Sequence, residues 1–152
     1  MNQLNSIADN YYLVSAFIAW FSAQLIKFFT HIFVHKKIDF RKLTSSGGMP
    51  SSHSSAVCGL AASVALVYGF DSVSFAICFV FGIVVMYDAA GVRRETGKQA
   101  RILNRMVSDV MDNKPVYFQK ELKELVGHTP LEVLMGGLLG VAVAVAMYFV
   151  YR

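Results

Sequence analysis

The sequence is poor in charged residues and in cysteine. Asp, Glu, Lys and Arg make up 16% of its 152 residues, whereas a soluble domain usually carries about 25%. Together with a hydrophobic fraction of 55%, this shortage argues against an ordinary soluble protein. Both cysteines, Cys58 and Cys78, fall within apolar runs. We therefore expect small buried thiols rather than a disulfide framework.

Several functional signatures are also missing. There is no metal-ligand spacing such as H-E-x-x-H, and no aromatic-interleaved basic motif of the kind that binds nucleic acid. We expect no metal and no cofactor. The first ten residues lack the basic n-region of a secretory signal, so the first apolar run should be a retained helix. No internal repeat divides the chain, and its length fits a single domain over 1–152.

Four apolar runs predict an all-α membrane bundle of about four transmembrane helices. The last run, 131–150, carries a single charge and has about the 20 residues needed to span a bilayer. The other runs cover 11–33, 54–70 and 73–90. A tight turn joins the second and third of these, and Asp71 or Ser72 should cap the third helix. Loops at 34–53 and 91–130 connect the rest.

Basic residues gather on one side of this arrangement. Twelve of the fourteen Lys and Arg residues lie in the two long loops, which share one side of a four-helix bundle. Because basic loops stay in the cytoplasm, we expect an integral protein of the cell membrane with both termini outside. The net charge of +4 then favours a bilayer with anionic lipids as partner, rather than nucleic acid.

The loop at 91–130 contains an amphipathic pattern. Apolar residues recur at helical spacing between charges from Ile102 to Met111, which predicts a helix on the membrane surface or against the bundle. A soluble helical hairpin is the alternative. Pro115 should end this helix, and a short helix at about 116–126 should follow. Gly136 and Gly140 are spaced for close helix packing; the sequence leaves open whether the partner helix belongs to the same chain or to a homodimer.

Polar groups collect where the chain enters the second apolar run. The stretch S-G-G-M-P-S-S-H occupies residues 46–53. Proline suits the first turn of a helix, and Ser51 or Ser52 can cap it. Unpaired N–H groups at the helix start, with Gly48 allowing close approach, favour a phosphate beside His53. An ordinary glycine-rich turn with a serine cap explains the same residues.

Two further clusters approach the same side. Asp88, Arg93 and Arg94 lie where the third helix ends. Arginine suits phosphate oxygens, although it also anchors loops in the cytoplasm, and an acid at a membrane end usually has a partner or a role. The stretch H-T-P-L-E at 128–132 enters the last helix as a T-x-x-E capping box. The interval from His128 to Glu132 also lets the carboxylate orient the imidazole.

These motifs together resemble a known superfamily. P-S-S-H at 50–53, Y-D-A-A-G-V-R-R at 87–94 and G-H-T-P-L-E-V at 127–133 look like the divergent, small-membrane-protein branch of the type 2 phosphatidic acid phosphatase and vanadium haloperoxidase superfamily. The resemblance covers roughly 24–140. It implies a metal-independent phosphatase that uses a histidine nucleophile.

The resemblance also implies roles for individual residues. His128 would attack phosphorus, Glu132 would hold its ring, and His53 would protonate the leaving alkoxide. The phosphate oxygens would be held by Ser51, Ser52, amides near Gly48, and Arg41.

The first motif departs from the superfamily's usual Lys-x6-Arg-Pro. Val34 stands at the lysine position and Lys42 follows Arg41, so Lys27 or Lys37 would have to supply the amine. Lys27 lies about 24 Å along its helix, near the inner surface. Snorkelling and phosphate contact are equally good explanations for it.

The later motif departs as well. Typical members carry Ser-Arg six residues before the nucleophile pair, but Leu122 occupies the arginine position. Arg93 or Arg94 would fill that space from another loop. Typical members also have six membrane helices, more than this chain can form.

Three functions therefore compete. The leading hypothesis is a membrane phosphatase that acts on a lipid phosphate monoester at the cytoplasmic leaflet through a phosphohistidine. The second is a non-catalytic binder or carrier of anionic lipid. The third is a metal site built from His53, Asp88, His128 and Glu132. The sequence does not distinguish phosphatidic acid, phosphatidylglycerophosphate and polyprenyl phosphates as substrates.

Overall fold

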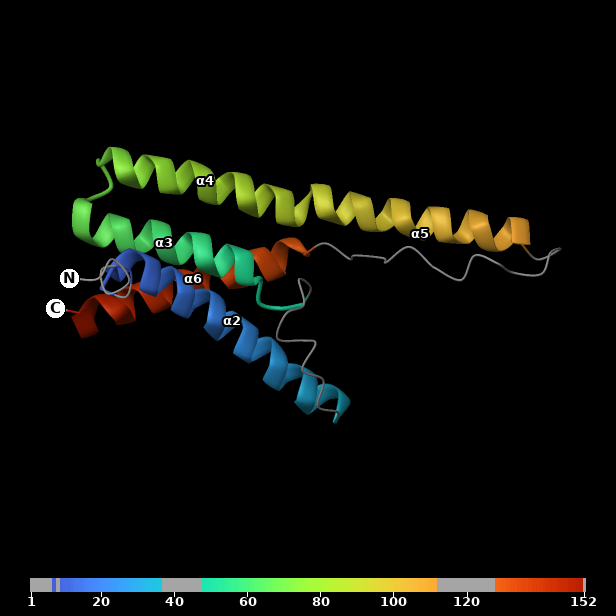
Figure 1. The fold of residues 1–152 in the computed structure, drawn as a ribbon, viewed down its shortest axis with the longest axis horizontal. Helices are drawn as coiled ribbons and strands as arrows, with labels where there is room; N and C mark the ends of the chain where they lie inside the picture. Colours follow the sequence, from blue (N-terminus) through green and yellow to red (C-terminus); the bar gives the residue numbers. More distant parts are fainter. Residues whose placement is uncertain (1–6, 8, 37–47, 112–127, 152) are drawn as a thin grey trace.

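All regular secondary structure in the described part of the chain is helical. The computed structural model describes residues 7, 9–36, 48–111 and 128–151. These residues form α2 (Tyr11–His35), α3 (Ser52–Tyr68), α4 (Val73–Ala90), α5 (Val92–Met111) and α6 (Pro130–Tyr151) (Figure 1). The predicted all-α membrane bundle is confirmed.

Side-chain caps fix where the helices begin. The Asn10 side chain accepts from two backbone amides at the start of α2. Ser51 caps α3 by accepting from the amide of Ser54, and Ser72 caps α4 by accepting from the amide of Phe75. Of the candidates that the sequence left open, the caps are therefore Ser51 and Ser72. Because Ser51 is the cap, α3 starts two residues earlier than predicted.

The bundle is built around α3. This helix packs against α2, α4 and α6, and α6 also contacts α2. The start of α2 and the end of α6 lie at one end of the bundle (Figure 1). At the other end, the amide of His128 donates to the carbonyl of Ala89 at 3.1 Å, and the amide of Ser51 donates to the carbonyl of Glu132 at 2.9 Å. The end of α4 and the starts of α3 and α6 thus meet at one place.

Small residues form the interior. Every buried hydrophobic residue in the described ranges is alanine or valine, and the largest fully buried side chains are serines. A Cβ added to Gly136 would collide with the Ser51 carbonyl oxygen, and one added to Gly140 would collide with that of Ser55. The helix that these glycines pack against is therefore α3 of the same chain. Such close packing through small residues is typical of membrane helices.

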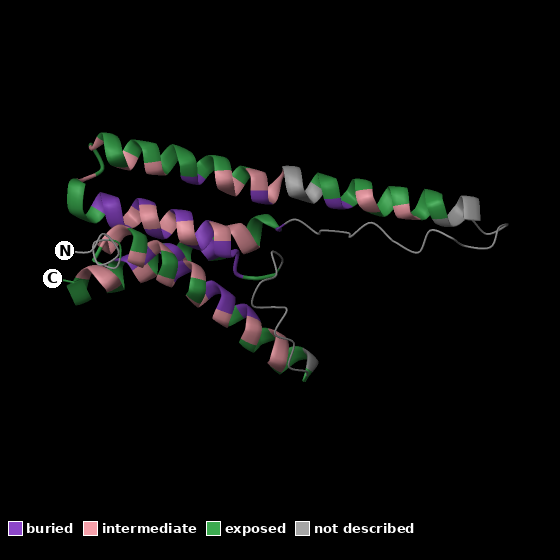
Figure 2. Ribbon diagram, in the orientation of Figure 1, coloured by how far each residue is buried: buried purple, intermediate pink, exposed green. Residues whose placement is uncertain are grey.

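Large apolar side chains lie on the outside instead. Figure 2 shows the outer face of α4 exposed along its length while α3 is largely covered. Among the described residues, three segments are long and apolar enough to cross a membrane: Tyr11–Val34, Val73–Val107 and Pro130–Tyr151. Helix α3 is apolar but shorter, with 17 residues. An apolar exterior over a small-residue interior identifies an integral membrane protein.

The amphipathic helix is present as α5, but it does not pack against the rest of the bundle. It continues the direction of α4 (Figure 1) and contacts only that helix among those described. Ile102, Leu103, Met106 and Val107 are each about half exposed. Of the two placements expected for this helix, packing against the bundle is thus limited to α4 among the described helices, and a place on the membrane surface stays a prediction. Pro115 and the helix predicted at 116–126 lie outside the described residues.

Candidate active site

The candidate site lies where the first turns of α3 and α6 meet the buried face of α2. The bond from the Ser51 amide to the Glu132 carbonyl joins the two helix starts directly. Since α3 begins with Ser52 and His53, and α6 is preceded by His128, this bond brings the two motif histidines to the same end of the bundle.

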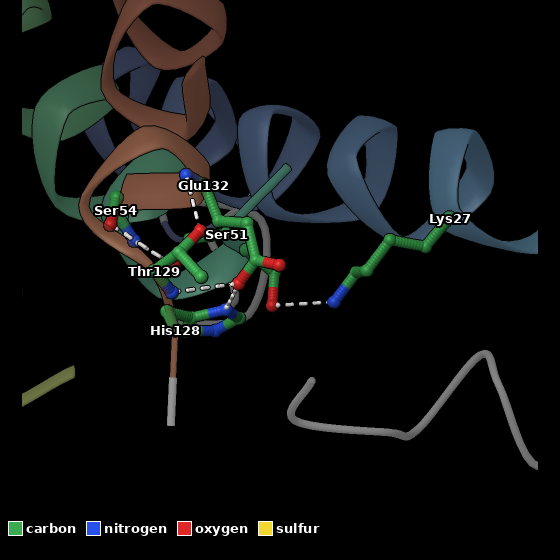
Figure 3. A network of polar contacts seen from close by, with 7 residues as sticks. Lys27, Ser51, Ser54, His128, Thr129 and Glu132 are labelled. Atoms are coloured by element: carbon green, nitrogen blue, oxygen red, sulfur yellow. Dashed lines mark hydrogen bonds and ion pairs between the residues drawn. The ribbon is translucent and has the colours of Figure 1, made fainter. Parts of the chain in front are cut away.

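A capping box positions Glu132 beside His128. The Thr129 hydroxyl accepts from the Glu132 amide at 3.3 Å, and the Glu132 carboxylate accepts from the Thr129 amide at 3.0 Å. The same carboxylate oxygen lies 3.0 Å from His128 Nδ1 (Figure 3). Glu132 therefore both closes the capping box and orients the imidazole, two roles that the sequence pattern suggested separately.

This contact fixes how the His128 ring is protonated when neutral. An ionised carboxylate can only accept hydrogen bonds, so Nδ1 must carry the proton and Nε2 must carry the lone pair. The ring is 2% exposed. Its Nε2 is buried and has no hydrogen-bond partner among the described residues. A basic nitrogen held in this way is suited to nucleophilic attack.

His53 approaches the same ring from α3. The centroids of the His53 and His128 rings are 6.4 Å apart, with an angle of 62° between their planes. Two imidazoles at this separation can both contact one phosphoryl group. The structure thus brings together two histidines that are 75 residues apart in the sequence.

Lys27 extends from α2 to the start of α3. Its side chain is 6% exposed, and its Nζ lies 3.2 Å from the hydroxyl oxygen of Ser52, to which it donates (Figure 3). Glu132 is close enough to act on this ammonium electrostatically. Gly48, at a φ of +92°, adjoins the lysine stem, since a Cβ built there would lie 3.6 Å from Lys27 Cδ. This burial favours phosphate contact over snorkelling, and the role of Lys27 stays a prediction.

The start of α3 offers further donors. Ser51 and Ser52 are almost fully buried, and the Ser51 hydroxyl oxygen accepts from the Ser54 hydroxyl at 3.0 Å. The Ser54 amide is capped by Ser51 and the Ser51 amide donates to the Glu132 carbonyl. Between them, Ser52 and His53 have backbone amides in the first turn, where a helix has no intrahelical acceptor and attracts anions. A phosphate placed here would also face the Lys27 ammonium.

Comparison with known proteins agrees with these motifs. The model of the Divergent PAP2 family matches residues 8–143. The chain belongs to the Divergent PAP2 family. It is also 41% identical to the "Uncharacterized membrane protein YuiD" of Bacillus subtilis (strain 168), over 95% of this chain and 98% of that protein. No solved structure matches the chain.

Other predicted phosphate ligands of this Divergent PAP2 family member are only partly placed. Arg41, like Lys37, lies outside the described residues. Arg93 and Arg94 begin α5, directly after the end of α4, but their side chains are outside the description. The choice between these two arginines stays a prediction.

Asp88 is half-buried in the last turn of α4. It precedes Ala89, whose carbonyl accepts from the His128 amide. In the described parts of the chain, no group of three or more His, Cys, Asp or Glu side chains lies close enough to hold a metal ion. Asp88 and the two histidines thus do not form the cluster of ligands that the metal hypothesis required within the described residues.

One buried polar residue, Gln24, was assigned no role from the sequence. Gln24 is 4% exposed on α2, and its Oε1 has no hydrogen-bond partner within the described ranges. The available signal was a glutamine in an apolar run, three residues before Lys27.

Proposed function

We propose that this protein is a membrane phosphatase that hydrolyses a lipid phosphate monoester through a phosphohistidine on His128. Membership of the Divergent PAP2 family supports a relationship to phosphatases of this type. The observation that carries the proposal is the state of His128: Nδ1 is held by Glu132, whereas Nε2 is buried, unpartnered among the described residues and next to His53.

In the first step, the lone pair of His128 Nε2 attacks phosphorus and the bond from phosphorus to the alkyl oxygen breaks. His53, in its protonated form, gives its proton to the departing alkoxide, which leaves as an alcohol. The Glu132 carboxylate stabilises the positive charge that develops on the His128 ring. Lys27 and the amides of the α3 start balance the charge on the phosphoryl oxygens.

In the second step, water attacks the phosphohistidine. His53, now neutral, takes the proton from this water, and the bond between phosphorus and Nε2 breaks. Inorganic phosphate leaves, and both histidines return to their starting states. Arg41 and either Arg93 or Arg94 are proposed as additional phosphate ligands.

The distribution of charge supports the cytoplasmic leaflet of the cell membrane as the place of reaction. The candidate site lies at the end of the bundle from which the two basic loops emerge. Loops rich in Lys and Arg stay in the cytoplasm, and an anionic leaflet attracts them. A phosphorylated lipid in that leaflet would present its head group to the site.

The test is to trap the phosphoprotein. Purified protein in detergent is mixed with a ³²P-labelled lipid phosphate and quenched rapidly with alkali, which preserves phosphohistidine. The wild-type protein should be labelled, and His128→Ala should not. His35→Ala is the control: it changes the last residue of α2, two turns beyond Lys27, and should be labelled normally.

Two results would overturn this function. One is full turnover of phosphate esters by His128→Ala. The other is binding of lipid phosphate by the wild-type protein with neither labelling nor phosphate release, which would identify a non-catalytic binder of anionic lipid.

A further inference from the structure

Gln24 is a buried polar side chain that the proposed reaction does not use. It is 4% exposed, and no described residue forms a hydrogen bond with its Oε1. Burying a carboxamide without hydrogen bonds is unfavourable, so native structures nearly always pair such groups. Contacts with the described residues therefore do not account for a polar side chain at this position.

The position of Gln24 relative to Lys27 suggests that reason. Residues three apart on a helix are neighbours on one face, and both side chains are buried there. Because α2 starts at the opposite end of the bundle and runs toward the candidate site, Gln24 lies about 4.5 Å deeper in the bundle than Lys27. A lipid whose phosphate contacts Lys27 would place the atoms next to its phosphate at the depth of Gln24.

We propose that Gln24 binds the glycerol-ester part of the substrate and thereby selects glycerol-based lipid phosphates. This inference rests on the proposed phosphatase function. A carboxamide both donates and accepts, so it can pair with ester carbonyls and with glycerol hydroxyls. Glycerol-based lipid phosphates carry these oxygens between the phosphate and the hydrocarbon chains. Polyprenyl and simple alkyl phosphates carry only hydrocarbon at this depth and would leave the amide unpaired.

Gln24→Met tests the selection, because methionine keeps the length of the side chain and removes its hydrogen bonds. We compare kcat/KM for a diacylglycerol phosphate and for an n-alkyl phosphate in the same detergent. The variant should lose about 3- to 10-fold on the glycerol-based substrate, the loss expected for a hydrogen bond, and should keep its rate on the alkyl phosphate. Its thermal stability should be unchanged or raised, since the buried Oε1 has no hydrogen-bond partner within the described protein.

Gln99→Met is the matched control, because Gln99 is an exposed glutamine on α5; it should match the wild type on both substrates. The inference is overturned if Gln24→Met lowers both rates equally, leaves both unchanged, or lowers the thermal stability, since the last result would show that the amide supports the fold. If the wild-type protein releases no phosphate from either lipid or from p-nitrophenyl phosphate, the proposed function itself fails. That outcome is distinct from activity without a change in substrate preference.

Discussion

Replacement of Gly136 by alanine should move the start of α6 away from the start of α3, the two helix ends that carry the candidate site. The added Cβ would collide with the Ser51 carbonyl oxygen and would lie 3.1 Å from both the carbonyl carbon and the Cβ of Ser51. To restore ordinary contacts, α6 would have to move away from the start of α3 by roughly 1 Å. The obstacle is backbone rather than a flexible side chain, so local adjustment cannot relieve it.

The magnitude follows from the contacts that such a movement affects. Overpacking of this kind costs about 1–3 kcal/mol. The 2.9 Å bond from the Ser51 amide to the Glu132 carbonyl would lengthen beyond hydrogen-bonding range, at a further cost of about 1 kcal/mol. The 6.4 Å separation of the His53 and His128 rings would widen by a similar distance. A misplacement of about 1 Å can reduce turnover about 100-fold.

The assay compares thermal unfolding in detergent and kcat for Gly136→Ala and Gly137→Ala. Helix propensity alone would favour alanine at both positions by up to about 1 kcal/mol. At Gly137 the nearest obstacle is the Cys58 Sγ at 3.3 Å, which can rotate away, so that variant should be stable and active. If Gly136→Ala matched Gly137→Ala in stability and turnover, the close contact between α3 and α6 would not be what aligns the site.

Three further predictions concern the charged groups of the site. Glu132→Gln keeps a capping side chain but loses the charge-assisted hydrogen bond to His128, so kcat should fall about 10-fold or more with little change in thermal stability. Thr129→Ala should instead lose about 1 kcal/mol of stability and keep most of its turnover. The reverse pattern would refute the orienting role of Glu132. Lys27→Met should raise the inhibition constant of inorganic phosphate about 10-fold or more, and an unchanged constant in well-expressed protein would show that the ammonium does not contact phosphate. His53→Gln should lower kcat/KM for the lipid phosphate, because it removes the acid that protonates the leaving alkoxide, and an unchanged kcat/KM would refute that role.

Local patterns in the sequence were sufficient for most of the fold. The starts of α2, α3, α4 and α6 are set by a nearby cap or capping box, as at Ser72 and Thr129, because these interactions span only three residues. The apolar runs predicted the membrane helices because segment length and hydropathy are local properties. The amphipathic pattern likewise located α5. It could not predict that α5 extends away from the bundle, because the packing of an amphipathic face depends on what lies beside it.

The sequence by itself determined an all-α membrane protein of the Divergent PAP2 type, with histidines at two helix starts and basic loops on one side. Only the tertiary structure decided that α3 and α6 approach closely enough to place His53 beside His128. It also decided that Lys27 points into the site and that Gln24 is buried without a partner among the described residues. These features depend on the direction of side chains and on the distance between helices that are remote in the sequence. Both are set by packing, here by glycines that let one helix rest on the backbone of another.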